Sequence, residues 1–469
     1  MKYVILSFTA LLMAGCAAVG PDYAGPEQLL DAKKQSGFQS LEMQSLDVQA
    51  LYPQQPPVDA WWVQLKDPTL TRLIEQALVA NTDLRIALAN LTAARAVLRE
   101  TTIGLQPSVD LTAGSERLRR SSVDQFQTQA RTINSASLGF AWELDVFGRV
   151  RRSIEAARSN IERSEVLHED VKRIVIADVA SAYFDLRGAQ ERRKVVERNI
   201  NNQRETMELT ITLTREGMSS QLDTARAHAQ HSATQALLPT IISDQNAALN
   251  RLARLTGRVP GLLDISLQRQ GVLPTMPAFI AVGDPASLIR RRPDIREAER
   301  GLASLTAQVG VVTADLFPTV NFIASVGVAA NSGSSLSDHS ASNFAVAPGI
   351  VWNLFNRSAI RARIEQAKAS AEAQLARYDG VVLLALEEVN SALMRHAQER
   401  ERNRVLREYV AASLEAVELV KLRYNAGAES FLDVLDAERT LLEAERGLTA
   451  SKIDFAQETV NLHRALGGV

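Results

Sequence analysis

The sequence predicts a mainly α-helical chain with two β-hairpins, built as an internal duplication. Three observations point to this fold class. Segments of the second half repeat segments of the first at a nearly constant spacing. Two stretches of about 60 residues contain almost no glycine or proline and are rich in the strong helix formers Ala, Glu, Arg and Leu. Shorter segments alternate apolar with small or polar residues, as strands with one apolar face do.

The composition excludes several classes of function. The chain has 469 residues, a formal net charge of -2 and one cysteine. Near-neutral charge gives no reason to expect a nucleic-acid partner, and one cysteine excludes both a disulfide framework and a cysteine-based zinc site. His228 and His231 lie three apart without an acidic or thiol partner nearby, so we predict no metal ligand. Because no phosphate loop, nucleophile elbow or paired cysteine motif is found, we predict no catalytic residue, no cofactor and no enzyme.

The N-terminus has the layout of a secretory signal peptide. Met1-Lys2 is followed by an apolar run too short to span a bilayer, and the small pair Ala14-Gly15 precedes Cys16. Small residues before a cysteine resemble the cleavage motif of bacterial lipoproteins, although Met13 stands where leucine is usual. We therefore predict a signal peptide over residues 1–15 and lipidation of Cys16 as the new, diacylated N-terminus. The alternative is a cysteine discarded with an ordinary signal.

The second half repeats the first at a shift of 210 or 211 residues. Asp83-Leu84-Arg85 recurs as Asp294-Ile295-Arg296, a shift of 211, and Trp142 recurs as Trp352, a shift of 210. Each repeat is expected to run as helix, hairpin, long helix, turn and long helix. The expected segments are an N-terminal arm (16–60), a first repeat (61–257), a Pro/Gly-bearing linker (258–285) and a second repeat (286–469).

The long helices are expected over residues 152–213 and 361–424. Their apolar residues form broken stripes, as in Val171, Val175 and Val179. Heptad-like stripes of this kind pack against neighbouring helices rather than around a compact core. A plain coiled coil would show the same pattern, so the hairpins distinguish this chain.

The β-hairpins are expected over residues 107–147 and 318–355. In the first, Phe140 and Trp142 lie on an apolar face, with small or polar residues between them. Trp142 and Trp352, at corresponding strand ends, are expected in an interfacial aromatic girdle rather than a binding pocket. A soluble half-buried sheet shows the same alternation, but the predicted signal peptide and lipid anchor favour a membrane sheet.

No segment after the signal peptide offers about 18 consecutive apolar residues, so no transmembrane helix is predicted and strands would have to cross the membrane. Four strands cannot close a barrel, and an open sheet edge leaves unpaired backbone groups in hydrocarbon. We therefore expect several copies to contribute two hairpins each to one shared β-barrel, with the long helices continuing as a helical tube.

Several motifs together resemble the outer-membrane efflux protein family, the TolC-like and NodT-type lipoproteins that serve as exit ducts of tripartite pumps. The resemblance covers nearly the whole mature chain. It is carried by Val19-Gly20-Pro21-Asp22-Tyr23, Trp61-Trp62 with Asp67-Pro68, residues 81–85, Arg291-Arg292-Pro293-Asp294-Ile295, and Arg423-Tyr424 leading through Gly427 into Leu432-Asp433-Val434-Leu435-Asp436-Ala437-Glu438-Arg439.

This resemblance implies a homotrimer with a 12-stranded outer-membrane β-barrel over a periplasmic α-helical barrel. The N-terminal arm, the linker and the C-terminal end would form an equatorial belt. The implied partners are a periplasmic adaptor (membrane fusion) protein, an inner-membrane transporter of the resistance-nodulation-division (RND) type and outer-membrane lipid. The implied location is the Gram-negative outer membrane, with most of the chain in the periplasm, and Ala17 after Cys16 favours this sorting.

The expected gate lies at the helix-turn-helix tips, where Gly217 and Gly427 end the long helices and Asp223 begins the next. The resemblance maps the gate of the family onto Tyr424, Leu432 and Asp436. Asp433 lies three residues before Asp436 and shares its helix face, so a ring of such carboxylates would form a cation site and a constriction. The alternative is that Asp433 and Asp436 only cap or solvate the helix start. Asn425 stands where some members have a basic residue, so a gate salt bridge from that position is not expected.

The function implied is a passive exit duct for drugs or other toxic small molecules, driven by the transporter. A duct of the same fold for type I protein secretion or metal-ion efflux is an alternative. Another is a lipid-anchored structural coiled-coil protein of the envelope.

Overall fold

The computed structural model describes residues 18–25, 51–53, 55–56, 58–119, 130–262, 267–283 and 285–468. The predicted signal peptide and Cys16 lie outside these residues. The described chain is mostly helical with one four-stranded antiparallel sheet, so the predicted fold class of the protomer is confirmed. The chain divides into two compact units, and each unit takes segments from both sequence repeats.

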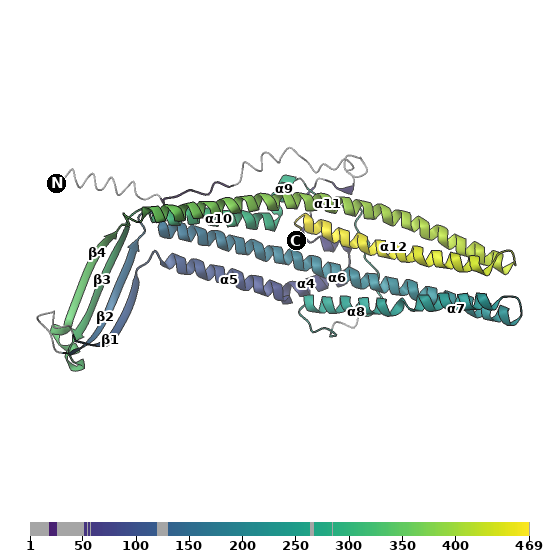
Figure 1. Ribbon diagram of the computed structural model, residues 1–469, viewed down its shortest axis with the longest axis horizontal. Helices are drawn as coiled ribbons and strands as arrows, with labels where there is room; N and C mark the ends of the chain where they lie inside the picture. The colour runs from purple at the N-terminus through teal and green to yellow at the C-terminus, as the bar shows by residue number, and fades with distance from the viewer. Residues whose placement is uncertain are drawn as a thin grey trace. The chain divides into compact units, whose positions relative to one another are not determined.

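The sheet belongs to the first unit, and Figure 1 shows its strands side by side in the order of the chain. Each strand pairs antiparallel with the next, which leaves β1 and β4 as the two edges. The strands are β1 (Ser108–Leu118), β2 (Arg131–Leu144), β3 (Thr319–Ala330) and β4 (Ser342–Val351).

The register gathers the apolar residues of all four strands on one face. Leu138 of β2 lies opposite Leu111 of β1 and Val326 of β3, and Val326 lies opposite Phe344 of β4. Because side chains alternate along a strand, the residues between them form the other face, which is mostly small or polar. Leu111, Leu138, Val326 and Phe344 are all exposed, so nothing in the described chain covers the apolar face.

The rest of the first unit is helical. α10 (Pro293–Ala314) packs against the start of α6 (Arg149–Arg215), where the Ser304 hydroxyl donates to the Ala156 carbonyl at 3.2 Å. It also contacts the start of α11 (Arg357–Asn425), where the Gln374 amide donates to the Ala298 carbonyl. The end of α5 (Thr82–Ile103) belongs to this unit too.

Among the described residues, the second unit contains the remainder of α5, α6, α10 and α11 and six further elements. Its larger core includes Leu70, Phe184 and Leu252, which are fully buried. No helix among the described residues is both long enough and apolar enough to cross a membrane. The further elements are η2 (Trp61–Leu65), α4 (Pro68–Ala80), α7 (Gln221–Gln235), α8 (Leu238–Leu255), α9 (Pro285–Arg291) and α12 (Phe431–Ala465).

One expectation about the helices was wrong. We expected a single return helix in each repeat, but in the first repeat it is interrupted between α7 and α8. Pro239 explains the break, because its ring has no N–H and collides with the carbonyl four residues earlier, at Gln235, where α7 ends. At the matching position, 210 residues later, Thr449 allows α12 to continue without interruption.

Three distant segments of the chain meet in the second unit, as the resemblance implies. Residues 51–53 pair with residues 280–282, since the Ile280 amide donates to the Leu51 carbonyl at 2.9 Å. The Tyr52 side chain packs in a small core with Leu462 at the end of α12, and its hydroxyl lies 2.7 Å from Nδ1 of His396. The N-terminal arm, the linker and the C-terminal end are thereby held together.

Candidate functional site

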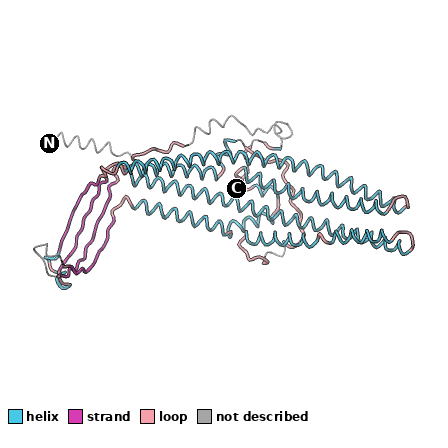
Figure 2. Tube along the Cα trace, viewed as in Figure 1, coloured by secondary structure: helices cyan, strands magenta, loops and turns pink. Residues whose placement is uncertain are grey.

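Two turns at the same end of the second unit connect α6 to α7 and α11 to α12 (Figure 2). Gly217 and Gly427 have φ angles of 75° and 72°, which only glycine adopts without strain. The amide of Met218 donates to the Leu213 carbonyl, and the amide of Ala428 donates to the Arg423 carbonyl. The two turns therefore end their helices with the same glycine motif.

Each turn leads into a capping box. In the first, the amide of Asp223 donates to the Ser220 hydroxyl at 3.1 Å, and the Ser220 amide donates back to the carboxylate. Ser430 and Asp433 make the same exchange at the start of α12. The Ser220 hydroxyl holds the pKa of Asp223 below its usual value. The capping alternative considered for Asp433 is therefore present in the structure.

The other acid on the first turns of α12 is bound differently. Asp436 accepts from Arg439 at 2.6 Å, and both side chains are mostly exposed, so this ion pair contributes little stability. Leu432 is 52% exposed, and Asp433 is exposed too. Leu432, Asp433 and Asp436 thus leave an apolar side chain and two carboxylates on the surface near the tip.

Tyr424 brings the two tips together. Its ring lies 5.7 Å from the ring of Phe431, which is buried. Burial raises the pKa of the Tyr424 phenol, and the charge of Asp223 raises it further, whereas the Ser219 hydroxyl lowers it. Asp223 and Ser219 belong to the first tip, so the phenol of the second tip faces the first. Asn425 has a neutral side chain that cannot form a salt bridge, and the neighbouring Arg423 pairs with Glu429 across its own turn at 2.8 Å.

A buried ionic contact close to the tips was missed from the sequence. The Glu438 side chain is only 6% exposed, and its carboxylate accepts from Lys421 at 2.7 Å and from the Thr206 hydroxyl at 3.0 Å. It joins α12 to both α11 and α6. The matching residue of the first repeat, 210 positions earlier, is His228, so a comparison of the repeats would have singled out this acid.

Glu438 is the first step of a series of contacts between α6 and α12. Seven residues further on, Glu445 accepts from Asn199 at 2.8 Å, and after seven more Lys452 pairs with Glu191 at 3.0 Å. A seven-residue interval keeps side chains on one seam of a supercoiled helix pair. The two helical hairpins, one made of α6, α7 and α8 and the other of α11 and α12, are therefore linked at several places along their length.

Comparison with known proteins identifies the family. Residues 73–258 and 285–468 match the family described as "Outer membrane efflux protein". The chain belongs to this family. This efflux protein is 30% identical to nodulation protein T of Rhizobium leguminosarum bv. trifolii over 460 residues, which cover 98% of the chain and 96% of that protein. It is also 30% identical to the antibiotic efflux pump outer membrane protein ArpC of Pseudomonas putida, covering 99% and 94% of the two chains.

Solved structures agree with this assignment. The outer-membrane channel OprN superposes with a TM-score of 0.88 and 36% identity, covering 97% of this efflux protein and 99% of OprN. The open state of the Neisseria gonorrhoeae channel MtrE superposes with a TM-score of 0.80 and 28% identity, covering 96% and 98%. The efflux protein is therefore an outer-membrane component of an efflux pump, and the predicted resemblance is confirmed.

The two predicted interfacial tryptophans of the efflux protein lie at matching strand ends, Trp142 near the end of β2 and Trp352 directly after β4. The Trp142 indole donates to the Leu105 carbonyl and the Trp352 indole to the Leu316 carbonyl, both at 3.0 Å. Trp352 is 47% exposed. Each indole thus ties the end of one strand to the segment that precedes its hairpin partner.

The two histidines that we do not expect to bind a metal differ in burial: His228 is exposed and His231 is buried. The described residues contain no group of three or more His, Cys, Asp or Glu side chains arranged to hold a metal ion.

Proposed function

We propose that this protein is the passive exit duct of a tripartite pump, working as a homotrimer in the Gram-negative outer membrane. A periplasmic adaptor and an inner-membrane RND-type transporter would supply it with drugs or other toxic small molecules. The names of the relatives support this substrate class, since they include an antibiotic efflux pump protein and a toluene efflux pump protein of Pseudomonas putida.

The observation that carries the proposal is the sheet. It has one exposed apolar face and two open edges, β1 and β4. In hydrocarbon, each unpaired backbone group at such an edge costs several kcal/mol, so the edges must pair with those of other copies. Three copies of a four-stranded sheet would supply the 12 strands of a closed barrel whose outer face is apolar.

Lipidation of Cys16 at the membrane surface fits the position of the residues that follow it. The buried Arg152 donates to the Asp22 carboxylate at 2.7 Å and to the carbonyl of Val19 at 3.1 Å. The Val19 amide donates to the carbonyl of Phe147, three residues after the end of β2. The chain just after Cys16 is therefore fixed beside the sheet. We propose that the signal peptide ends at residue 15 and is followed by the arm (16–60), the first repeat (61–257), the linker (258–285) and the second repeat (286–469).

For the gate, we propose that Tyr424, Leu432, Asp433 and Asp436 line a constriction that the trimer repeats around its axis. The turns at Gly217 and Gly427, with Asp223, would hold the tips in place. Exposure of Leu432 and both carboxylates supports this, as does the position of Tyr424 against the first tip. A ring of carboxylates would favour cations and restrict flow.

Conductance in planar bilayers tests the duct and the gate together. We expect the wild-type protein to conduct ions weakly, and Tyr424→Ala and Asp436→Ala to conduct several times more, because each removes part of the constriction. Glu408→Ala, which removes an exposed carboxylate of α11, is the matched control and should conduct as wild type does. Equal and negligible conductance from all four inserted proteins would count against the gate, and a detergent-extracted monomer would refute the duct.

A further inference from the structure

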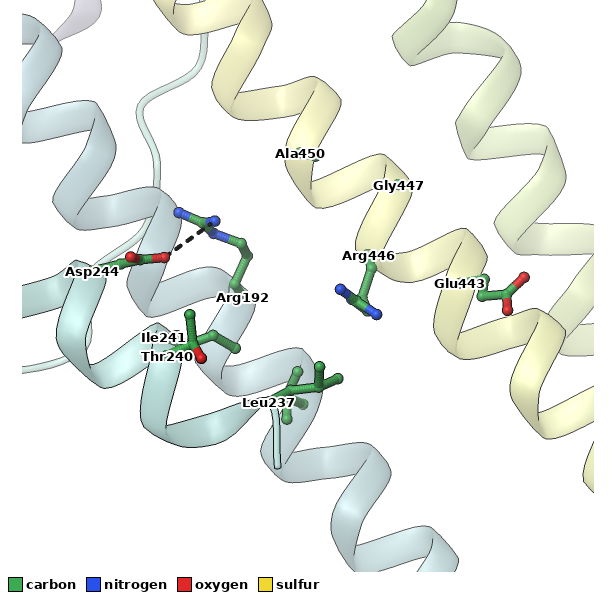
Figure 3. A pocket seen from close by; sticks show the side chains of 10 residues that line it. Arg192, Leu237, Thr240, Ile241, Asp244, Glu443, Arg446, Gly447 and Ala450 are labelled. Atoms are coloured by element: carbon green, nitrogen blue, oxygen red, sulfur yellow. Dashed lines mark ion pairs between the residues drawn. The ribbon is translucent and has the colours of Figure 1, made fainter. Parts of the chain in front are cut away.

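An open groove of about 470 Å³ lies on the second unit, between α6, α8 and α12 (Figure 3). It opens where Pro239 separates α7 from α8. Leu237 lies at this break, and Ala450 of α12, which also lines the groove, has only a methyl side chain. The groove thus lies where the two repeats differ, since α12 continues through Thr449 at the position that matches Pro239.

Two arginines reach this groove from different helices. Figure 3 shows Arg192 of α6 beside Asp244, and Arg446 of α12 directed toward the groove, while Glu443 points to the other side of its helix. The Arg446 side chain makes no hydrogen bond or ion pair with any residue that the structure describes. A guanidinium without a partner carries five N–H groups that are free to bind an anion.

Arg192 is also incompletely paired. Its guanidinium lies 3.7 Å from Asp244, and its Nε atom is buried with no hydrogen-bond partner. The corresponding arginine of the second repeat, Arg402, pairs with both Glu399 and Asp454 at 3.3 Å. Arg192 thus keeps a buried N–H donor without a partner, whereas its counterpart Arg402 has two carboxylate partners.

The walls between the two arginines are mainly apolar. Val196 on α6 and Leu237 and Ile241 beside the helix break line the groove. The groove volume lies in the range typical of sites for small molecules. An apolar wall with guanidinium groups at two sides suits a ligand that has an apolar body and one anionic head.

We propose that this groove binds small amphipathic organic anions, such as aromatic or short-chain carboxylates and sulfonates. The anionic head contacts Arg446 and Arg192, and the apolar body lies on Val196, Leu237 and Ile241. Because the arginines belong to α12 and α6, a bound anion links the two hairpins. The proposal uses only side chains of the second unit and does not depend on the pump.

Calorimetric titration of the full-length protein, in an uncharged detergent, tests this site. The probe is naphthalene-2-sulfonate, and the neutral comparison is naphthalene-2-methanol. We expect Arg446→Gln to weaken binding of the sulfonate about tenfold or more, because a charge-assisted hydrogen bond is lost, and to leave binding of the alcohol unchanged. Arg402→Gln, at the counterpart of Arg192 and outside the groove, should leave both affinities unchanged.

A second variant tests the groove without touching the charges. Ala450 lines the groove one turn after Arg446, so Ala450→Leu would fill the space and should abolish binding of both probes, while Arg446 and Arg192 remain. The proposal is overturned if the sulfonate binds wild type and Arg446→Gln equally, if the alcohol binds wild type as tightly as the sulfonate, or if Ala450→Leu binds as wild type does. It is also overturned if wild type binds neither probe.

Discussion

Two buried histidines should make the second unit sensitive to acid. His396 is hydrogen-bonded to the Tyr52 hydroxyl, and His463 stacks on Trp61 with ring centroids 4.7 Å apart. Burial, with the charge of Arg400 adding to it, lowers the pKa of His396 to about 4, and burial together with His396 lowers the pKa of His463 to about 3. Both rings are therefore neutral in the folded protein at pH 7.

The sign and size of the effect follow from these values. An unfolded histidine takes up a proton below its usual pKa of about 6.5, whereas the folded residues stay neutral until near pH 4 or below. The free energy of unfolding is therefore highest above about pH 6.5 and decreases as the pH falls from there toward 4, because the unfolded chain takes up the protons first. For His396 alone, the loss in the free energy of unfolding is about 2 kcal/mol at pH 5 and about 3 kcal/mol below pH 4.

His463→Phe is the informative variant. Neither ring nitrogen of His463 has a hydrogen-bond partner, so phenylalanine keeps the stacking on Trp61 and loses no bond. We expect the unfolding temperature at pH 8 to be similar to wild type, and its fall between pH 7 and pH 5 to be about half as large. The measurement is tryptophan fluorescence during heating of the detergent-solubilised protein at a series of pH values.

His228→Asn, which replaces an exposed histidine of the same unit, is the control and should follow the wild-type pH profile. A His463→Phe protein that loses as much stability on acidification as wild type does would refute the reasoning. It would mean that the buried imidazole is not the group that takes up the proton on unfolding.

The remaining predictions concern the helices and the N-terminal segment. Glu438→Ala should lower the free energy of unfolding by about 1–2 kcal/mol, because Lys421 loses its partner in a half-exposed setting, and Glu438→Gln should lose less; unfolding in denaturant measures both. Gly427→Ala should lower the free energy of unfolding by about 1 kcal/mol, because Gly427 has a positive φ angle. Gly380 lies in open space on α11, so Gly380→Ala should raise the free energy of unfolding by about 0.5–1 kcal/mol. A change of the same sign in both variants would contradict this reasoning. Arg152→Ala should speed proteolysis within residues 18–25, and an unchanged cleavage rate would argue against its role in holding them.

The parts of the fold that the sequence predicted depend on local periodicity. The long helices follow from uninterrupted stretches of helix-forming residues, and α6 and α11 extend only a few residues beyond the predicted ranges. The strands follow from alternation, which fixes the apolar face once the register is set. The signals at the starts of α7 and α12 are equally local, since each capping box spans four residues.

What the sequence did not predict depends on contacts between distant segments. Nothing near Glu438 indicates that Lys421 and Thr206 will surround it, and nothing near His463 indicates that Trp61 will cover its ring. The interruption at Pro239 could have been foreseen, because proline inside a helical pattern is a local signal, but the groove that it opens depends on α12 lying opposite.

The duplication gives these differences a common explanation. Two repeats with the same backbone plan share whatever the plan requires, such as the glycine turns and the capping boxes at both tips. Positions that differ are therefore free to acquire separate roles. Glu438 links the helical hairpins where His228 is exposed, and Pro239 interrupts the helix of the first repeat where Thr449 lets α12 continue. It follows that the residues specific to one repeat, rather than those common to both, are where the two hairpins of each copy become mechanically and chemically unequal.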